Sequence, residues 1–177
     1  ERIHTMLDAL ANQRNAPGTN DQKAADFYAA YLDTAAIEAR GLAPLQPTLD
    51  AIAGARTHDD VARLIARPDL DLPGPIGIGI SIDQKDPDRY VAVVTHSGLG
   101  LPEREYYLRE DAQFQDIRRK YVEHMTRAFA LLGEREPAKS AQAVLALETE
   151  IAKRHWVIAK RRERELVYNP RTRAELD

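Results

Sequence analysis

The most informative absence in this 177-residue sequence is cysteine. Without it the chain forms neither a disulfide framework nor a thiolate metal site. Aromatic residues make up only 6% of the chain, which argues against a nucleic-acid surface built on stacking. The net charge is −3 with both signs interspersed, so no general attraction to nucleic acid or to an anionic membrane is expected. No apolar run approaches the roughly 20 residues that a membrane-spanning helix requires.

The five histidines do not form a metal-binding motif. A His-Glu-x-x-His helix would place two imidazoles and a general base around a zinc-bound water, but no histidine here has a second one four residues on. Glu148 and His155 are seven residues apart and share a helix face, and two such ligands are too few for a metal. We therefore predict no metal ligands and no catalytic residues in this chain.

A glycine pair after an expected strand also needs an interpretation. Gly98-Leu99-Gly100 is similar to a dinucleotide-binding loop. Glu103 stands in place of the third glycine, however, and Pro102 interrupts the turn. A structural role for this loop is the better interpretation.

Hydrophobic periodicity predicts a fold that is mainly α with one β-hairpin. In most of the chain apolar residues recur every three or four positions, as on one face of a helix. One short run, Ile76–Ile82, alternates with period two, and a second apolar run, Tyr90–His96, follows it after a polar, turn-rich segment, as the strands of a hairpin do. The predicted elements in order are a helix from Ile3, a helix over Asp21–Glu38, shorter helices around Leu49 and Val61, strands at Ile76–Ile82 and Tyr90–His96, and long helices over Phe114–Leu132 and Ala141–Ile158.

The run Lys160–Glu165 is rich in basic residues and has two interpretations. A phosphate-binding patch is one of them. Glu163 and Glu165 interrupt the run, and Arg161 with Glu165 makes an opposite-charge i, i+4 pair. A solvated helix face is therefore favoured.

The most distinctive stretch is Gly98-Leu99-Gly100-Leu101-Pro102-Glu103-Arg104-Glu105-Tyr106-Tyr107-Leu108, between the hairpin and the long helices. Its glycines permit positive φ, its proline cannot continue a strand ladder, and we expect Leu99 and Leu101 to be buried. The stretch resembles the Gly-Leu-Gly-Leu-Pro-x-Arg-x-Tyr-Tyr element of neprilysin-family zinc metallopeptidases, which include neprilysin, endothelin-converting enzyme and bacterial oligopeptidases. Three further motifs follow the order of that family: Phe27–Asp33 with the turn at Gly41–Leu45, Leu147–Ala152, and Tyr168–Leu176.

This resemblance implies both an architecture and a role. Residues 1–177 would be part of the N-terminal domain, the helical lobe of a two-lobed metallopeptidase that encloses substrate. Zinc would belong to the catalytic domain of the same polypeptide, outside this chain, and none would bind this fragment. The partners would be that domain and oligopeptides small enough to enter an internal chamber, which the parent enzyme would cleave on the amino side of hydrophobic residues.

The resemblance also bears on the source of the chain. Animal ectodomains of this family are cross-linked, so a cysteine-free member is expected to be bacterial, and periplasmic or secreted. The ends of the sequence suit a piece of a longer polypeptide. Glu1 enters a helical pattern without an initiator methionine, and Thr172 with Glu175 has the pattern of a capping box for a helix that is cut off at Asp177.

Asp33 is the one residue that we single out for substrate binding. It follows the Phe- and Tyr-rich face of the second expected helix, near a helix end, where a cation is normally preferred. The plainer interpretation is an exposed charge or a cap for the next turn. The functional one comes from the resemblance, because polar residues of this family's N-terminal lobe face the central cavity and bind the C-terminal side of the substrate. The arginines that do so in the family belong to a stretch at or before Glu1.

Two other functions stay open at this point. The alternative is a self-contained helical protein-interaction module without enzymatic activity, and the full reading frame would separate this from the peptidase. A downstream His-Glu-x-x-His motif supports the peptidase, whereas a stop codon near Asp177 supports the module. An independent hydrolase would need a convergent cluster of titratable side chains that the sequence does not show.

Overall fold

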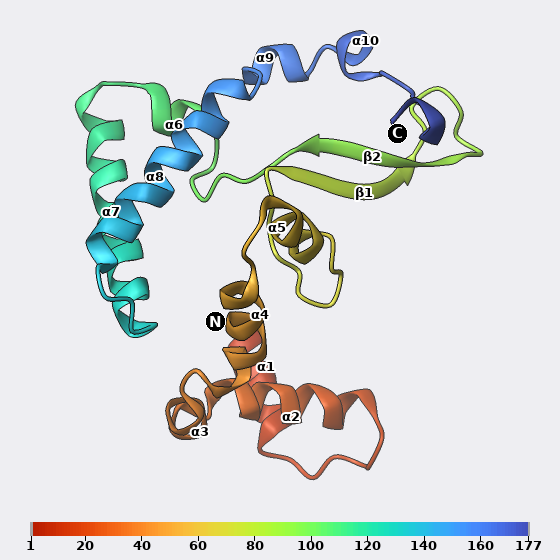
Figure 1. The fold of residues 1–177 in the computed structure, drawn as a ribbon. Helices are drawn as coiled ribbons and strands as arrows, with labels where there is room; N and C mark the ends of the chain where they lie inside the picture. The colour runs from red at the N-terminus through yellow and green to blue at the C-terminus, as the bar shows by residue number, and fades with distance from the viewer. Residues whose placement is uncertain (1, 177) are drawn as a thin grey trace. The chain divides into compact units, whose positions relative to one another are not determined.

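The structure is a computed structural model that describes residues 2–176, and it divides into two compact units, residues 1–55 and 56–177 (Figure 1). The prediction of a mainly α fold with one β-hairpin is confirmed. Within the described residues, no helix is both long and apolar enough to cross a membrane. The first unit contains α1 (Arg2–Ala11), α2 (Asn20–Leu32), α3 (Thr34–Arg40), the 3-10 turn η1 (Ala43–Leu45) and α4 (Gln46–Gly54). The second contains α5 (His58–Ile65), β1 (Ile76–Ile82), β2 (Tyr90–His96), α6 (Glu105–Leu108), α7 (Ala112–Leu131), α8 (Pro137–Arg154), α9 (Ile158–Arg161), α10 (Arg164–Val167) and the turn η2 (Arg173–Glu175).

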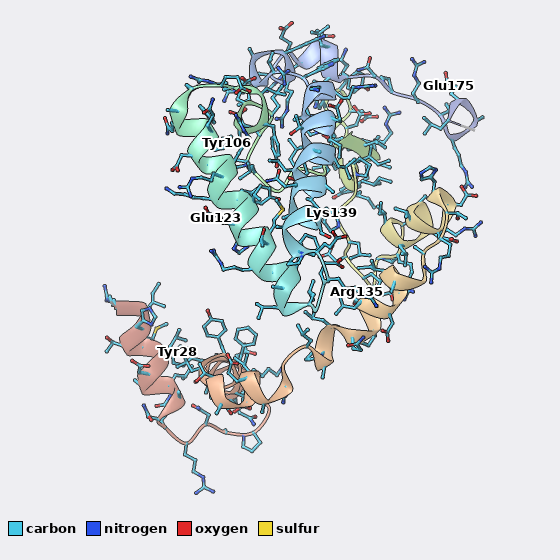
Figure 2. The ribbon with its side chains drawn as sticks, turned by 60° about the vertical axis from the view of Figure 1, so that its left-hand side comes forward. Tyr28, Tyr106, Glu123, Arg135, Lys139 and Glu175 are labelled. Carbon is cyan, nitrogen blue, oxygen red and sulfur yellow. The ribbon has the colours of Figure 1, made fainter. Side chains whose placement is uncertain are left out.

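Helices α1 and α2 pack together in the first unit. The hydroxyl of Thr19 accepts from the backbone N–H of Gln22 at 3.2 Å and so begins α2. The OH of Tyr28, on the side of α2 that faces α1, donates to Asp8 at 2.9 Å (Figure 2). The prediction of one continuous helix over residues 21–38 is wrong, because the chain breaks at Asp33 into α2 and α3.

The apolar face of α2 is mostly uncovered in its unit. Phe27 and Tyr31 are 77% and 71% exposed. Among the described residues of this unit, Ala25 alone is buried. The periodicity of this helix therefore identifies an apolar face that the unit itself does not pack.

Several helix ends follow the local signals that predict them. Thr57 and Asp60 form a reciprocal capping box at the start of α5. Gly41 ends α3 with a φ of +49°, and Pro137 occupies the first turn of α8. These elements begin and end where the sequence predicts, because caps depend on residues a few positions away.

The hairpin has the predicted strands. β1 and β2 pair antiparallel, with Ile76 opposite His96 and Ile82 opposite Tyr90. Directly paired residues share a face of the sheet, so one face carries the isoleucines of β1 and the other carries Gly77 and Gly79. Within the described residues of this unit, neither face is covered along most of its length.

Helices α7 and α8 lie side by side as the main packed layer of the second unit (Figure 1). Gly133, with a φ of +77°, begins the turn between them. Met125 on α7 is buried, and Ala141 and Ala152 on α8 are fully buried. The short helix α6 packs against both long helices.

The C-terminal segment departs from the sequence prediction. Helix α8 ends at Arg154 rather than at Ile158, and His155 is its C-cap. A new short helix, α9, ends at Arg161, so Arg161 and Glu165 do not share a helix face. Glu165 forms an ion pair with Lys85 of the hairpin loop at 3.2 Å instead. The predicted i, i+4 pair is therefore wrong, because a tertiary contact replaces it.

Candidate functional site

The loop between the hairpin and the helices begins with a close backbone approach at Gly98. The φ of Gly98 is +84°, a left-handed conformation that favours glycine. A Cβ at this position would lie 2.9 Å from the Cα of Pro75 and 3.1 Å from the carbonyl oxygen of Gly74. The N–H of Ser97 donates to the carbonyl of Pro75 at 3.0 Å. The loop thus starts against the segment that precedes β1.

Glu148 of α8 is the acceptor around which the rest of this loop is arranged. Its Oε1 accepts from the N–H of Gly100 and from the OH of Tyr121, both at 3.1 Å. Its Oε2 accepts from the OH of Tyr107 at 2.9 Å, and the Tyr107 oxygen accepts from the N–H of Leu101 at 2.8 Å. We refer to Glu148, Gly100, Tyr107 and Tyr121 as the Glu148 cluster.

The two tyrosines of the cluster are fixed as neutral donors. Burial and, to a smaller extent, the neighbouring Glu148 carboxylate together raise the pKa of Tyr121 to about 12. Burial likewise raises the pKa of Tyr107, which is only 3% exposed. The expectation that Leu99 and Leu101 are the buried residues is wrong, since both are half-buried. Tyr107 is the buried anchor of this loop, because its hydroxyl has an acceptor inside the protein.

A second group, the histidine pocket, lies where β2 meets the end of α8. The rings of His96 and His155 are 3.9 Å apart between centroids. Nε2 of His155 donates to the carbonyl of Ser97 at 3.1 Å, whereas Nε2 of His96 has no hydrogen-bond partner within residues 2–176. The adjoining cavity has a volume of about 150 Å³, and its wall includes Glu103 and Arg161.

Burial lowers the pKa of both histidines of the pocket. The positive charge of a protonated His155 and the guanidinium of Arg161 lower the pKa of His96 further. For His155, the Ser97 carbonyl acts in the opposite direction, and Arg161 and Arg104 lower the pKa. The pair is therefore neutral near pH 7.

The lowered pKa values of His96 and His155 predict that the chain loses stability in mild acid. The folded chain binds protons at His96 and His155 less readily than the unfolded chain, whose histidines titrate near a pKa of about 6.5. The free energy of unfolding should therefore fall as the pH drops below about 6.5. Urea midpoints at pH 7.5 and pH 5.5 measure this fall, which should shrink in His96→Asn and stay unchanged in His4→Gln, where an exposed histidine is removed. An unchanged fall in His96→Asn would show that the pair is not responsible.

The third group is the Asp83 clamp, formed by Asp83, Lys85, Arg89, Glu165 and Tyr168. Asp83 follows β1 and is 4% exposed. It accepts from the N–H of Lys85 at 2.8 Å, from the guanidinium of Arg89, and from the OH of Tyr168 at 3.1 Å. The Lys85 N–H and the Arg89 guanidinium lower the pKa of Asp83. Nζ of Lys85 lies 4.6 Å from the centre of the Tyr168 ring, so the hairpin loop holds the segment that follows α10.

The structure places Asp33 between two helices. Its N–H donates to the carbonyl of Ala29 at 3.1 Å, at the end of α2, and its Oδ1 accepts from the N–H of Ala36 at 2.9 Å. The exposed carboxylate therefore caps α3, which agrees with the plainer interpretation of this residue. The cap uses one oxygen of the Asp33 carboxylate, Oδ1. A contact between Asp33 and substrate stays a prediction.

Glu148 and His155, the two possible metal ligands on one helix, belong to different groups. Glu148 binds the loop at Gly100, and His155 binds Ser97. Within residues 2–176, no group of three or more acidic or histidine side chains is arranged to hold a metal ion.

Sequence reasoning missed the roles of Glu148, Asp83 and the two histidines of the pocket. Gly100 and Glu148 are 48 positions apart, and Asp83 and Tyr168 are 85 apart, so no periodic pattern joins them. The available signal lay in the motifs themselves, because the stretches with Gly100, Glu148 and Tyr168 are those that carry the family resemblance.

Comparison with known proteins identifies the source of these motifs. A family model described as peptidase family M13, in its N-terminal domain, matches residues 1–177. The chain belongs to peptidase family M13. Among the relatives of this M13 chain, endothelin-converting enzyme 1 of Cavia porcellus and of Homo sapiens are each 28% identical over 178 residues. The alignment covers 94% of the chain and 23% of either relative.

Solved structures show the same fold. The zinc metalloprotease Zmp1 of Mycobacterium tuberculosis, in complex with an inhibitor, is 35% identical and superimposes with a TM-score of 0.84 over 99% of this chain. Its open state superimposes with a TM-score of 0.82. The match covers 27% of the Zmp1 chain, so this M13 chain spans about a quarter of the length of its relatives.

Proposed function

We propose that this chain is the non-catalytic N-terminal lobe of a zinc metalloendopeptidase that cleaves oligopeptides. The observation that carries the proposal is the likeness to Zmp1, a zinc metalloprotease, over 99% of the chain at 35% identity. Zinc and the catalytic residues would be supplied by the part of the parent polypeptide that corresponds to the rest of Zmp1. The lobe would enclose the substrate chamber and limit the size of peptides that enter, with cleavage on the amino side of hydrophobic residues.

The groups described above support a structural role for this lobe. Hydrogen bonds within the lobe join distant segments in the Glu148 cluster, the histidine pocket and the Asp83 clamp, so these groups hold the hairpin, the loop and α8 together. A lobe that closes over substrate needs such internal rigidity, because loose elements would not define a size limit. A periplasmic or secreted location belongs to the same proposal, and cell fractionation with an antibody against the lobe tests it.

The proposal predicts that the 177-residue chain alone lacks zinc and peptidase activity. After dialysis against a chelator and then against zinc-containing buffer, elemental analysis should find far less than one zinc per chain. A bradykinin-like peptide should stay intact with the purified chain, and the parent enzyme under the same conditions provides the positive control. Stoichiometric zinc or peptide turnover by the isolated chain would contradict the assignment of chemistry to another domain.

Asp33 provides the test of substrate contact in the parent enzyme. Asp33→Asn keeps a side-chain oxygen for the cap of α3 and removes the charge, whereas Asp33→Ala removes both. If the charge touches substrate, both variants should lose about two- to tenfold in kcat/KM, and the loss should depend on peptide length and on charge at the C-terminal side. Zinc content and the pH profile should not change. If kcat/KM falls in Asp33→Ala and not in Asp33→Asn, the role of Asp33 is limited to capping α3.

A further inference from the structure

The histidine pocket joins the base of the hairpin to the end of α8 through two uncharged rings. His96 is the last residue of β2, and His155 is the C-cap of α8. Their ring centroids are 3.9 Å apart with the ring planes tilted by 43°, and His155 also binds the carbonyl of Ser97 across the junction. Because the contact packs two neutral imidazoles, its strength depends on whether the rings are protonated.

The charged side chains around the two rings favour the neutral state. The wall of the pocket includes one acidic side chain, Glu103, and two basic ones, Arg104 of the loop and Arg161 of α9. Oε2 of Glu103 has no hydrogen-bond partner within residues 2–176. Arg104 pairs with Glu105 at 3.4 Å, whereas Arg161 forms no ion pair with any described residue. A proton added to either ring would therefore lie in an environment that is already positive.

His96 is the ring that the closed pocket cannot accommodate in its charged form. Both nitrogens of an imidazolium carry a proton, so Nε2 of His96 would be a buried donor, and it has no partner among the described residues. His155 and the guanidinium of Arg161 also act against a positive charge on this ring. Such a donor is costly in the closed pocket and is solvated once the junction opens. His155 is less sensitive, because its Nε2 keeps the Ser97 acceptor in either state.

We propose that the histidine pocket is a pH-sensitive junction, which is closed near pH 7 and opens in mild acid while the rest of the second unit stays folded. Opening separates the base of β2 from the end of α8 and exposes both rings to water. It is distinct from the fall in global stability described above, because local openings occur at a lower free energy than complete unfolding. The inference concerns contacts within this chain and does not require the proposed function.

The neighbouring groups do not titrate in the same range, which confines the change to the pocket. The pKa of Asp83 in the clamp is lowered, so this carboxylate stays ionised in mild acid. The pKa values of Tyr107 and Tyr121 in the Glu148 cluster are raised, so both hydroxyls stay protonated. The Asp83 clamp and the donors of the Glu148 cluster are therefore unchanged when the junction opens.

Hydrogen exchange measured by mass spectrometry on the complete gene product tests the proposal. Peptides over residues 93–99 and 152–158 report the two sides of the pocket. Peptides over residues 82–89 report the Asp83 clamp, and those over residues 112–131 report α7. Exchange is measured at pH 7.5 and pH 5.5 and corrected for the intrinsic exchange rate at each pH.

Two variants and a matched control assign the pH dependence to the pocket. His96→Gln removes the ring that takes up the proton. Arg161→Gln removes the charge that faces it, and because Arg161 is exposed this variant keeps the test valid even if His96→Gln does not fold. Arg162→Gln is the control, since it removes the adjacent exposed arginine, which does not line the pocket.

The expected result is about tenfold more opening of both pocket peptides at pH 5.5 than at pH 7.5. This is the increase that one histidine can supply when its pKa in the open state is about 6.5 and the closed state does not take up the proton. The clamp and α7 peptides should not change. The increase should be several times smaller in His96→Gln, smaller also in Arg161→Gln, and unchanged in Arg162→Gln.

Three outcomes would overturn the proposal. One is equal opening of the pocket peptides at the two pH values. Another is an equal increase over α7, because acid would then unfold the whole unit. The third is an increase in His96→Gln and Arg161→Gln as large as that in Arg162→Gln, because the pH dependence would then belong to groups outside the pocket.

Discussion

Replacing Glu148 by alanine should lower the free energy of unfolding of the chain by about 3 kcal/mol. The substitution removes the acceptor for the Gly100 N–H and for the hydroxyls of Tyr107 and Tyr121. Hydrogen bonds to a charged group contribute about 1.5–3 kcal/mol each, and partial exposure of the cluster reduces the sum. Tyr107 carries most of the effect, because it is 3% exposed and its hydroxyl loses its acceptor in a buried position. The urea midpoint measured by circular dichroism reports the loss.

Glu148→Gln is the matched variant for this prediction. Its amide oxygen still accepts one hydrogen bond, but its amide nitrogen meets a donor where the second carboxylate oxygen was. The loss should therefore be smaller than in Glu148→Ala and clearly measurable. A midpoint for Glu148→Ala that equals that of the unsubstituted chain would show that the loop does not depend on the Glu148 cluster.

Gly98→Ala should be at least as damaging, at about 3–5 kcal/mol. A left-handed φ costs a residue with a side chain about 1–2 kcal/mol. The new Cβ would also meet the backbone of Pro75 at 2.9 Å, and backbone atoms in a turn cannot move aside as a flexible side chain does. The loop at Gly98 would have to move away from Gly74 and Pro75, which should lower the thermal midpoint by many degrees.

A comparison with Gly133→Ala separates the two causes of the lost stability, which are the left-handed φ and the contact of the new Cβ with Pro75. The φ of Gly133, +77°, is almost that of Gly98, but a Cβ there would meet no atom within 4 Å. Gly133→Ala should therefore cost about 1–2 kcal/mol, the backbone part alone. The difference between the two variants measures the close approach at Pro75. Equal losses would show that the contact at Pro75 contributes nothing.

The sequence predicts those parts of the fold that depend on near neighbours. The alternating run Ile76–Ile82 and the apolar run Tyr90–His96 give the hairpin its bounds, and Thr57 with Asp60 gives the start of α5. Asp33 shows the limit of this reasoning, because the apolar spacing continues across it while its side chain caps a new helix. Aspartate is a preferred N-cap residue, and Oδ1 of Asp33 accepts from the N–H of Ala36 at the start of the new helix.

The candidate site was less accessible to sequence reasoning. The Glu148 cluster, the histidine pocket and the Asp83 clamp join residues that are 48, 58 and 85 positions apart. Periodicity reports which face of an element is apolar, but it does not report which element will cover that face. Ile80 illustrates this, since its alternating pattern correctly predicts a strand while its exposure depends on residues elsewhere.

The three long-range contacts are nested in the sequence, and this affects how the chain can fold. Gly100 with Glu148 lies inside Ser97 with His155, which lies inside Asp83 with Tyr168. The entropy lost in closing a chain loop grows with the length of the loop that is still open. Once the innermost contact has formed, each later contact closes only the short segments on either side of it. The contacts can therefore form in order from the loop outwards to the Asp83 clamp, so that the contact spanning 85 residues closes only about 27 residues of open chain.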